Sequence, residues 1–266
     1  DFIIHMKNNT NLSLQNYNAL VCGSTSGIGK STAQELSKLG ANVTLFARNK
    51  NKLEAALKNL SHQDGQNHTI LTADFNDPAQ VKKVIEQHIN KENKFEILIN
   101  NSGGPKGGPI EKADISEFLE AFNRHLICNH IIAQALLPNM KHSKYGRIIN
   151  IISTSVKQPI PGLGVSNTIR GAVASWAKTL SFEVAQYGIT VNNILPGFTD
   201  TERLTSLIEA KSTIQNKSNK EIAQNMKKMI PTGRFGDPKE TAQAITFLAS
   251  ANAGYINGVN LAVDGG

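Results

Sequence analysis

Residues 18–29 read Asn18-Ala19-Leu20-Val21-Cys22-Gly23-Ser24-Thr25-Ser26-Gly27-Ile28-Gly29, a short apolar run that leads straight into a glycine-rich loop. The residues that follow, Lys30–Leu39, carry apolar side chains at helical spacing. Glycines let a chain turn at positive φ, let the backbone approach a phosphate and let a helix pack close to a strand. A helix that begins after such a loop points its free amides and its dipole at an anion. The stretch therefore predicts a dinucleotide site, although three glycines alone would fit a plain turn equally well.

Short apolar runs and amphipathic segments alternate along the rest of the chain. The expected strands are Asn18–Cys22, Val43–Phe46, Thr69–Ala73, Ile97–Asn100, Arg147–Ile152, Thr190–Leu195 and Val259–Val263. The expected helices are Lys30–Leu39, Lys50–Leu60, Pro78–Asn90, Ser116–Met140, Asn167–Tyr187 and Lys239–Ala249. Such alternation predicts right-handed crossovers. The fold class is therefore α/β, a Rossmann-type doubly wound parallel sheet of about seven strands with helices on both faces.

Length and composition agree with one domain. The chain has 266 residues, of which 39% are hydrophobic, and we expect a single domain at 18–266 after an N-terminal extension at 1–17. Residues 1–20 lack the apolar core of a signal peptide, and no later run approaches the ~18 apolar residues of a membrane span. Met6 is a candidate translation start, which would make Asp1–His5 an added leader.

The charge balance and the cysteines exclude several classes of function. The net charge is +7, but basic residues alternate with acidic ones through Lys82–Lys94 and Lys217–Lys239. This mixture favours a solvated surface over a nucleic-acid site. Cys22 and Cys128 are the only cysteines, so neither a disulfide framework nor a metal cluster is expected. A reducing, cytoplasmic location follows.

Five ordered motifs along the chain resemble those of the short-chain dehydrogenase/reductase family. They are Gly23-x-x-x-Gly27-Ile28-Gly29, Asn100-Asn101-Ser102-Gly103, Gly146–Ser153, Asn192–Gly197, and the ending Ile256–Val259 with Val263–Gly266. The resemblance covers about Ala19 to Gly266 and is strongest to the 3-oxoacyl-acyl-carrier-protein reductase branch. That label describes the scaffold more than the substrate.

The resemblance implies a set of cofactor-binding residues. The implied residues are Gly23, Thr25, Ser26, Gly27, Ile28 and Gly29 at the diphosphate, Asp74 and Phe75 beside the adenine, Asn101, Ser102 and Gly103 at the adenosine ribose, and Pro196, Gly197, Thr199 and Thr201 at the nicotinamide. Alternatively, Asp74 only caps a turn and Pro196-Gly197 only ends a strand.

The end of the second expected strand indicates the coenzyme. An NAD enzyme places a carboxylate there for the ribose hydroxyls, whereas Ala47-Arg48 offers one guanidinium suited to a 2′-phosphate. NADP is therefore favoured over NAD. Ser26 occupies the place where some NADP-binding members carry a second basic residue, and Arg48 could also be an ordinary surface residue.

The catalytic residues depart from the family pattern. Most members use a tetrad of Asn, Ser, Tyr and Lys, and counting from the flanking motifs places His125, Ser153, Ser166 and Arg170 at those positions. Serine is a far weaker acid than tyrosine, and Arg170 can bond ribose hydroxyls but cannot pass on a proton at neutral pH. His125 is the candidate replacement acid, with an apparent pKa expected near 6–8. It could equally be a satisfied helix residue, and Lys157 is expected to be a solvated loop residue.

Three functions remain open from the sequence. The first is NADP(H)-dependent interconversion of a carbonyl and an alcohol with a rebuilt proton path. The others are non-hydride chemistry such as dehydration or isomerisation, and an NADP-binding sensor or partner protein with little turnover. The resemblance also implies a substrate lid at about 201–228 and a homodimer or homotetramer formed by the long helices. Acyl-carrier binding is in doubt, because Arg147 matches one docking arginine but Tyr187 replaces the other.

Overall fold

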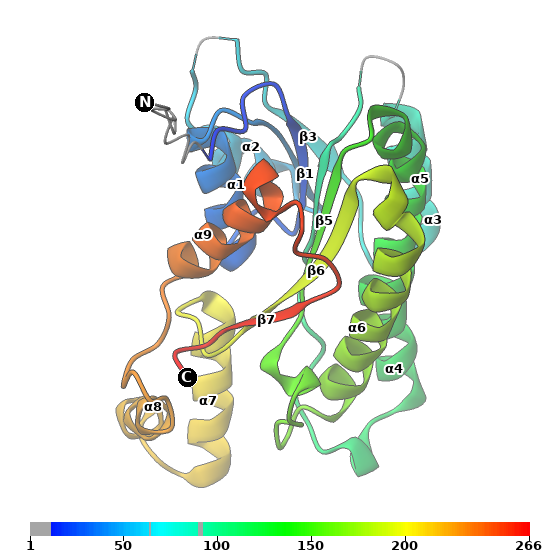
Figure 1. Cartoon of the computed structure of the whole chain (residues 1–266). Helices are drawn as coiled ribbons and strands as arrows, with labels where there is room; N and C mark the ends of the chain where they lie inside the picture. Colours follow the sequence, from blue (N-terminus) through cyan, green and yellow to red (C-terminus); the bar gives the residue numbers. More distant parts are fainter. Residues whose placement is uncertain (1–11, 64, 90–92) are drawn as a thin grey trace, which may run out of the picture.

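The central sheet has seven parallel strands in the order β3-β2-β1-β4-β5-β6-β7 (Figure 1). This computed structural model describes residues 12–63, 65–89 and 93–266. The strands are β1 (Asn18–Cys22), β2 (Asn42–Ala47), β3 (Thr69–Thr72), β4 (Ile97–Asn100), β5 (Gly146–Ile151), β6 (Ile189–Pro196) and β7 (Asn260–Val263). The expected fold class and strand order along the chain are confirmed.

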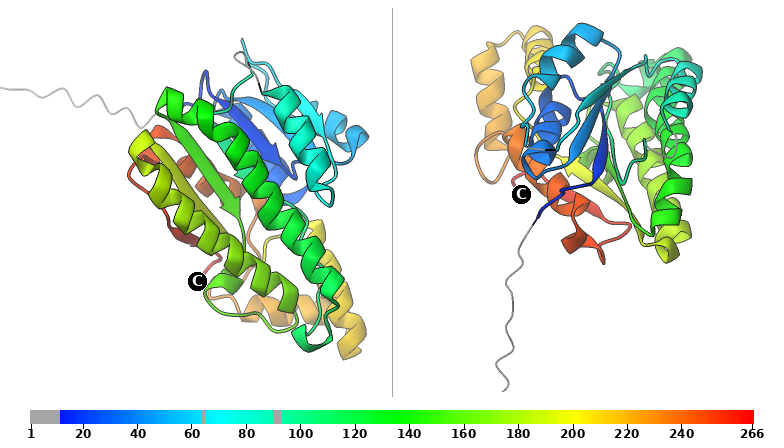
Figure 2. Two further views of the ribbon diagram at one scale, coloured as in Figure 1. Left: turned by 90° about the vertical axis from the view of Figure 1, so that its right-hand side faces the viewer. Right: turned by 90° about the horizontal axis from the view of Figure 1, so that it is seen from above.

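Helices cover both faces of the sheet (Figures 1 and 2). The longer helices are α1 (Gly27–Lys38), α2 (Lys50–Leu57), α3 (Pro78–His88), α4 (Ile115–Phe122), α5 (Cys128–Ser143), α6 (Gly164–Val184), α7 (Glu202–Gln215), α8 (Asn219–Lys228) and α9 (Pro238–Ala249). Side chains from α1, α2 and α9 share one buried cluster with alternate strand residues, and those from α3, α5 and α6 share another. Strands buried on both sides explain the continuous apolar runs in the sequence. The end of the expected helix at Asn90, and Met6 with Asp1–His5, lie outside the described residues.

The helix expected at Ser116–Met140 is present, but it contains a π-helical turn that the sequence did not reveal. The structure has α4, then a π-helical turn at Asn123–Ile127, then α5. A π-helical turn inserts extra residues without breaking the apolar pattern, so periodicity does not reveal it. His125 lies in this turn, where the insertion changes the direction in which side chains project.

A row of asparagine side chains crosses strands β4 to β7. Asn100 donates to Asn150 over 2.9 Å, Asn150 to Asn193 over 2.9 Å, and Asn193 to Asn260 over 2.8 Å. The four residues are in register across the three strand pairs. Because buried amides need partners, this row fixes the register of the strands that lead into the catalytic segment.

One further feature follows β6, and another precedes β1. The expected lid segment, 201–228, forms α7 and α8 around a small apolar cluster of Leu204, Ile222 and Met226. Within the expected N-terminal extension, Leu14 is fully buried and its amide donates to the Leu39 carbonyl. No helix among the described residues is long and apolar enough to span a membrane.

Candidate active site at the carboxyl ends of the strands

The glycine loop between β1 and α1 has the geometry of a close-approach turn. Gly23 and Gly27 have φ values of +58° and +51°, where a side chain would strain the backbone. A Cβ at Gly23 would lie 2.7 Å from the Asn101 carbonyl oxygen, and a Cβ at Gly29 would collide with the Gly23 carbonyl. The Asn101 side chain donates to that same carbonyl over 3.1 Å. The loop is thus held against the end of β4.

The start of α1 presents amides to the outside. Ser26 is the N-cap residue, yet its side chain caps no backbone amide, and the first turn carries no acidic residue. Ser24 is committed to the fold, since its fully buried hydroxyl accepts from the Phe46 amide over 3.1 Å. The first amides of a helix without a side-chain cap suit a phosphate group.

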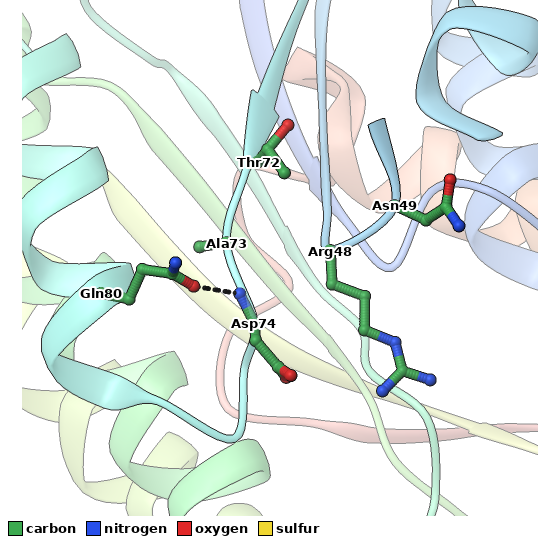
Figure 3. A pocket seen from close by; sticks show the side chains of 6 residues that line it. All are labelled: Arg48, Asn49, Thr72, Ala73, Asp74 and Gln80. Atoms are coloured by element: carbon green, nitrogen blue, oxygen red, sulfur yellow. Dashed lines mark hydrogen bonds between the residues drawn. The ribbon is translucent and has the colours of Figure 1, made fainter. Parts of the chain in front are cut away.

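A cavity of about 350 Å³ lies beside this loop at the ends of β2 and β3. It is lined by Arg48, Asn49, Thr72, Ala73, Asp74 and Gln80 (Figure 3). The Arg48 side chain is exposed, and no hydrogen bond or ion pair engages its guanidinium in the described part of the chain. Asp74 faces it across the cavity, with its amide held by Gln80 over 2.6 Å. Sequence reasoning missed Gln80, whose only signal is its place in the first turn of α3.

Phe75 differs from its expected role beside the adenine. Its ring is 8% exposed and packs edge-on against Phe46, with centroids 5.1 Å apart. Its carbonyl accepts from the Cys128 thiol. The side chain of Phe75 therefore belongs to the core, and only Asp74 of this pair presents a side chain to the cavity.

The segment after β6 joins the lid to the glycine loop. A Cβ at Gly197 would lie 2.7 Å from the Asp264 Cβ, so this glycine allows close packing against the C-terminal segment. Thr199 donates to the Gly197 carbonyl over 3.2 Å, and Thr201 caps the start of α7. The Thr201 methyl group lies 3.1 Å from the position of a Cβ at Gly27. Thr201 therefore brings the lid and the diphosphate loop together.

His125 and Ser102 form a short hydrogen bond at the end of β4. The Ser102 hydroxyl and His125 Nδ1 are 2.6 Å apart. His125 is 1% exposed, and its Nε2 atom has no hydrogen-bond partner among the described residues. Burial, with Arg170 and then Arg124 nearby, lowers the pKa of His125 well below its usual value, and the Gly103 carbonyl opposes this only in part.

The expected apparent pKa of 6–8 for His125 is therefore wrong. A buried imidazole beside guanidinium groups stays neutral at pH 7 because its charged form loses solvation and gains repulsion. A neutral imidazole can still donate one hydrogen bond and accept another. His125 is thus a hydrogen-bonding group and not a resting-state acid.

Arg170 and Ser166 lie one turn apart near the start of α6. Arg170 donates to the Ile151 carbonyl over 2.8 Å, at the end of β5. Burial lowers the pKa of Arg170 to about 10, and the nearby Arg203 guanidinium contributes. Ser153 follows β5 and accepts from the Ser155 amide over 3.1 Å. Of the four expected catalytic residues, Ser153 follows β5, His125 lies in the π-helical turn, and Ser166 and Arg170 lie on α6. Lys157 is exposed.

Arg203 is a second residue that sequence reasoning missed. It lies in the first turn of α7 and donates to the Pro105 carbonyl over 2.7 Å, so it bridges the lid and the loop after β4. The sequence carried no signal for it, because an arginine in a polar, lysine-rich segment resembles any solvated residue.

The chain is similar to known proteins along nearly its whole length. A family model described as Enoyl-(Acyl carrier protein) reductase matches residues 23–266. The 3-oxoacyl-acyl-carrier-protein reductase FabG of Haemophilus influenzae is 34% identical over 248 residues, which cover 93% of this chain and 96% of that protein. The corresponding protein of Rickettsia bellii is 31% identical over 255 residues, covering 96% and 98%.

Solved structures match as well. The L-sorbose reductase of Gluconobacter frateurii, complexed with NADPH and L-sorbose, has a TM-score of 0.89 at 28% identity and covers 96% of this chain and 98% of its own. An actinorhodin polyketide ketoreductase with NADPH has a TM-score of 0.87 at 29% identity, covering 94% and 96%.

Proposed function

We propose that this chain, which belongs to the short-chain dehydrogenase/reductase family, interconverts a carbonyl and an alcohol with NADP(H) as its cofactor. One observation carries the proposal. The glycine loop, the Arg48 cavity and the cluster of Ser102, His125 and Arg170 all lie where the strands end, the edge at which open α/β sheets bind ligands. Relatives described as NADPH-dependent reductases support it.

The residues present fit NADP(H). Gly23 and Gly29 let the loop pack tightly against Asn101 and against itself, and α1 offers amides without a side-chain cap to a phosphate. Arg48 stands free to bind a 2′-phosphate, a contact that an NAD enzyme replaces with a carboxylate. The nicotinamide, when bound, supplies or accepts the hydride. Arg170 would donate to the hydroxyls of the nicotinamide ribose.

The chain's own residues then stabilise the carbonyl oxygen. Ser153 and the charged Arg170 can donate hydrogen bonds to an oxygen that gains negative charge. Ser166 is too weak an acid to replace tyrosine, and His125 is neutral, so the proton comes from water. Losing a tuned general acid typically costs about 10²–10⁴ in rate. We therefore expect slow turnover with a shallow pH dependence near neutrality.

The assembly and location belong to the same proposal. Ile115, Leu119 and Phe122 on α4 are 38–79% exposed, and Phe182 on α6 is 88% exposed. Apolar side chains exposed along two helices suit a self-association surface, so we propose a homodimer or homotetramer. Cys22 and Cys128 are both free and buried, which suits a cytoplasmic location.

Arg147 does not support binding of an acyl-carrier protein. Its side chain is 4% exposed, stacks on Tyr145 and donates to the Ser250 carbonyl. The expected correspondence of Arg147 to a docking arginine is therefore wrong, because a buried side chain cannot meet a carrier protein. A free carbonyl compound is the better substrate class.

NADPH oxidation with a panel of ketones, aldehydes and 3-oxoacyl thioesters tests the proposal. We expect at least one carbonyl to accelerate NADPH consumption, with NADH less effective. The proposal fails if NADPH binds and no carbonyl accelerates its oxidation, which would favour a sensor or partner role.

A further inference from the structure

Two guanidinium groups converge above the loop that follows β4. The three atoms nearest to a Cβ placed on Gly104 are all guanidinium atoms. They are Arg203 Nη2 at 3.7 Å, Arg170 Nη2 at 3.9 Å and Arg203 Cζ at 3.9 Å. A Cβ on neighbouring Gly103 would meet nothing within 4 Å. The backbone here is therefore bare and open, and the groups that face the space at Gly104 are both cationic.

The two charges lack a counter-charge. Across residues 12–63, 65–89 and 93–266, no carboxylate lies within 4.0 Å of Arg170 or Arg203. In the described part of the chain each guanidinium instead donates one hydrogen bond, to the carbonyl of Ile151 or Pro105, although a guanidinium has five N–H donors. Like charges that share a partly buried space repel one another, and the lowered pKa of Arg170 reflects this repulsion as well as burial.

Arg170 and Arg203 come from other elements than the two expected phosphate sites. The diphosphate loop lies at α1 and the 2′-phosphate cavity lies at Arg48, whereas Arg170 comes from α6 and Arg203 from the lid. Gly104 is two residues beyond Ser102, which bonds His125. The loop also closes on the segment before α6, because the Gly108 amide donates to the Gly162 carbonyl over 2.7 Å. The pair thus borders the space for a reacting carbonyl.

We propose that Arg170 and Arg203 together bind an anionic group of the substrate, a carboxylate or a phosphate, over Gly104. The inference rests on the proposed function and names its substrate class as an oxo acid or a phosphorylated carbonyl compound. Paired guanidinium groups suit these anions because their donors match two oxygens at once. Arg203 joins the lid to the anion, so substrate charge and lid position are coupled.

Calorimetry with matched probes tests this without requiring turnover. The protein, with and without saturating NADP⁺, is titrated with acetoacetate against methyl acetoacetate, and with dihydroxyacetone phosphate against dihydroxyacetone. We expect the charged member of at least one pair to bind at least tenfold more tightly, a difference of about 1.4 kcal/mol. The pair that shows the preference identifies the anion. Equal affinities within both pairs overturn the proposal.

Three variants locate the effect. Arg203→Gln should raise the Kd of the preferred anion about tenfold, and Arg203→Lys should recover part of the loss because it restores the charge. Arg234→Gln is the matched control, since Arg234 is exposed and pairs with Glu240 instead. If Arg203→Gln weakens NADPH as much as the anion, Arg203 serves the cofactor, as Arg170 does at the nicotinamide ribose, and the proposal is wrong.

A purely structural role for Arg203 would be equally visible. If Arg203→Gln lowers Tm and weakens the charged and uncharged probes alike, Arg203 only holds the lid to Pro105 and the proposal is wrong. Because the readout is binding, an absence of carbonyl reduction would contradict the proposed function while the anion preference could still be measured.

Discussion

Strands β1–β3 and strands β4–β7 end in different surroundings. The first group ends at the glycine loop and the Arg48 cavity, where the residues fit the family's cofactor site. The second group is tied together by the asparagine row and ends at His125, Ser153 and the helix that carries Arg170, where three of the four tetrad positions are substituted. We therefore propose that cofactor binding and proton delivery are separable in this fold, and that only proton delivery has been altered.

Gly29→Ala should produce the largest effect on cofactor affinity, and it tests the cofactor site at the ends of β1–β3. The added methyl group would collide with the Gly23 carbonyl and the Asn101 side chain, so the loop must move. We expect NADPH affinity to fall about a hundredfold, or ~2.7 kcal/mol, measured by titration calorimetry. Gly171→Ala is the control: it adds a methyl group that meets nothing within 4 Å. A Gly29→Ala protein that binds NADPH normally would refute the loop assignment.

Asn150→Leu tests the asparagine row that joins strands β4–β7. The change leaves the Asn100 amide without its acceptor and the Asn193 oxygen without its donor. Each of the two unsatisfied buried groups costs about 1–3 kcal/mol, so urea unfolding should show a loss of about 2–6 kcal/mol. Ile148→Val, a buried apolar change on the same strand, should cost about 0.5–1.5 kcal/mol. Similar losses for the two variants would mean that the row adds nothing beyond packing.

Arg48→Ala should reduce the preference of the protein for NADP(H) over NAD(H). Removing one charge-assisted phosphate contact should weaken NADP(H) at least tenfold, about 1.4 kcal/mol, and leave NAD(H) unchanged. Lys52→Ala, a nearby exposed cation on α2, serves as the control. An unchanged preference in Arg48→Ala, by titration of both coenzymes, would make Arg48 an ordinary surface residue.

His125→Gln should change the pH dependence of stability more than that of the reaction. The pKa of His125 is lowered on folding, so the neutral form favours the folded state. That contribution is complete above the unfolded pKa near 6.5 and is lost as pH falls below it, by up to ~1.4 kcal/mol per pH unit. His68 and His88 have lowered pKa values as well, so the comparison is between the natural chain and the variant. Urea unfolding at pH 7.5 and 5.5 should show the smaller acid loss in His125→Gln, and identical losses would contradict the assignment.

The sequence predicted the order of elements because strand burial and helix periodicity are local patterns. The π-helical turn at His125 was missed because an inserted residue leaves the surrounding apolar spacing intact. The pKa of His125 and the role of Arg203 depend on neighbours far along the chain, Arg170 and Pro105, which no local pattern reveals. The motif at Asp74-Phe75 likewise did not reveal that the Phe75 side chain turns into the core, because that depends on its packing against Phe46. The residue-by-residue roles stay predictions.

Steady-state NADPH oxidation by the natural chain and by Ser166→Tyr/Arg170→Lys tests the central claim most directly. We expect measurable carbonyl-dependent oxidation by the natural chain. We also expect at least a tenfold rise in kcat when the tyrosine and lysine are restored, with the NADPH Kd within threefold. Binding of NADPH without carbonyl-dependent oxidation in either protein would contradict it.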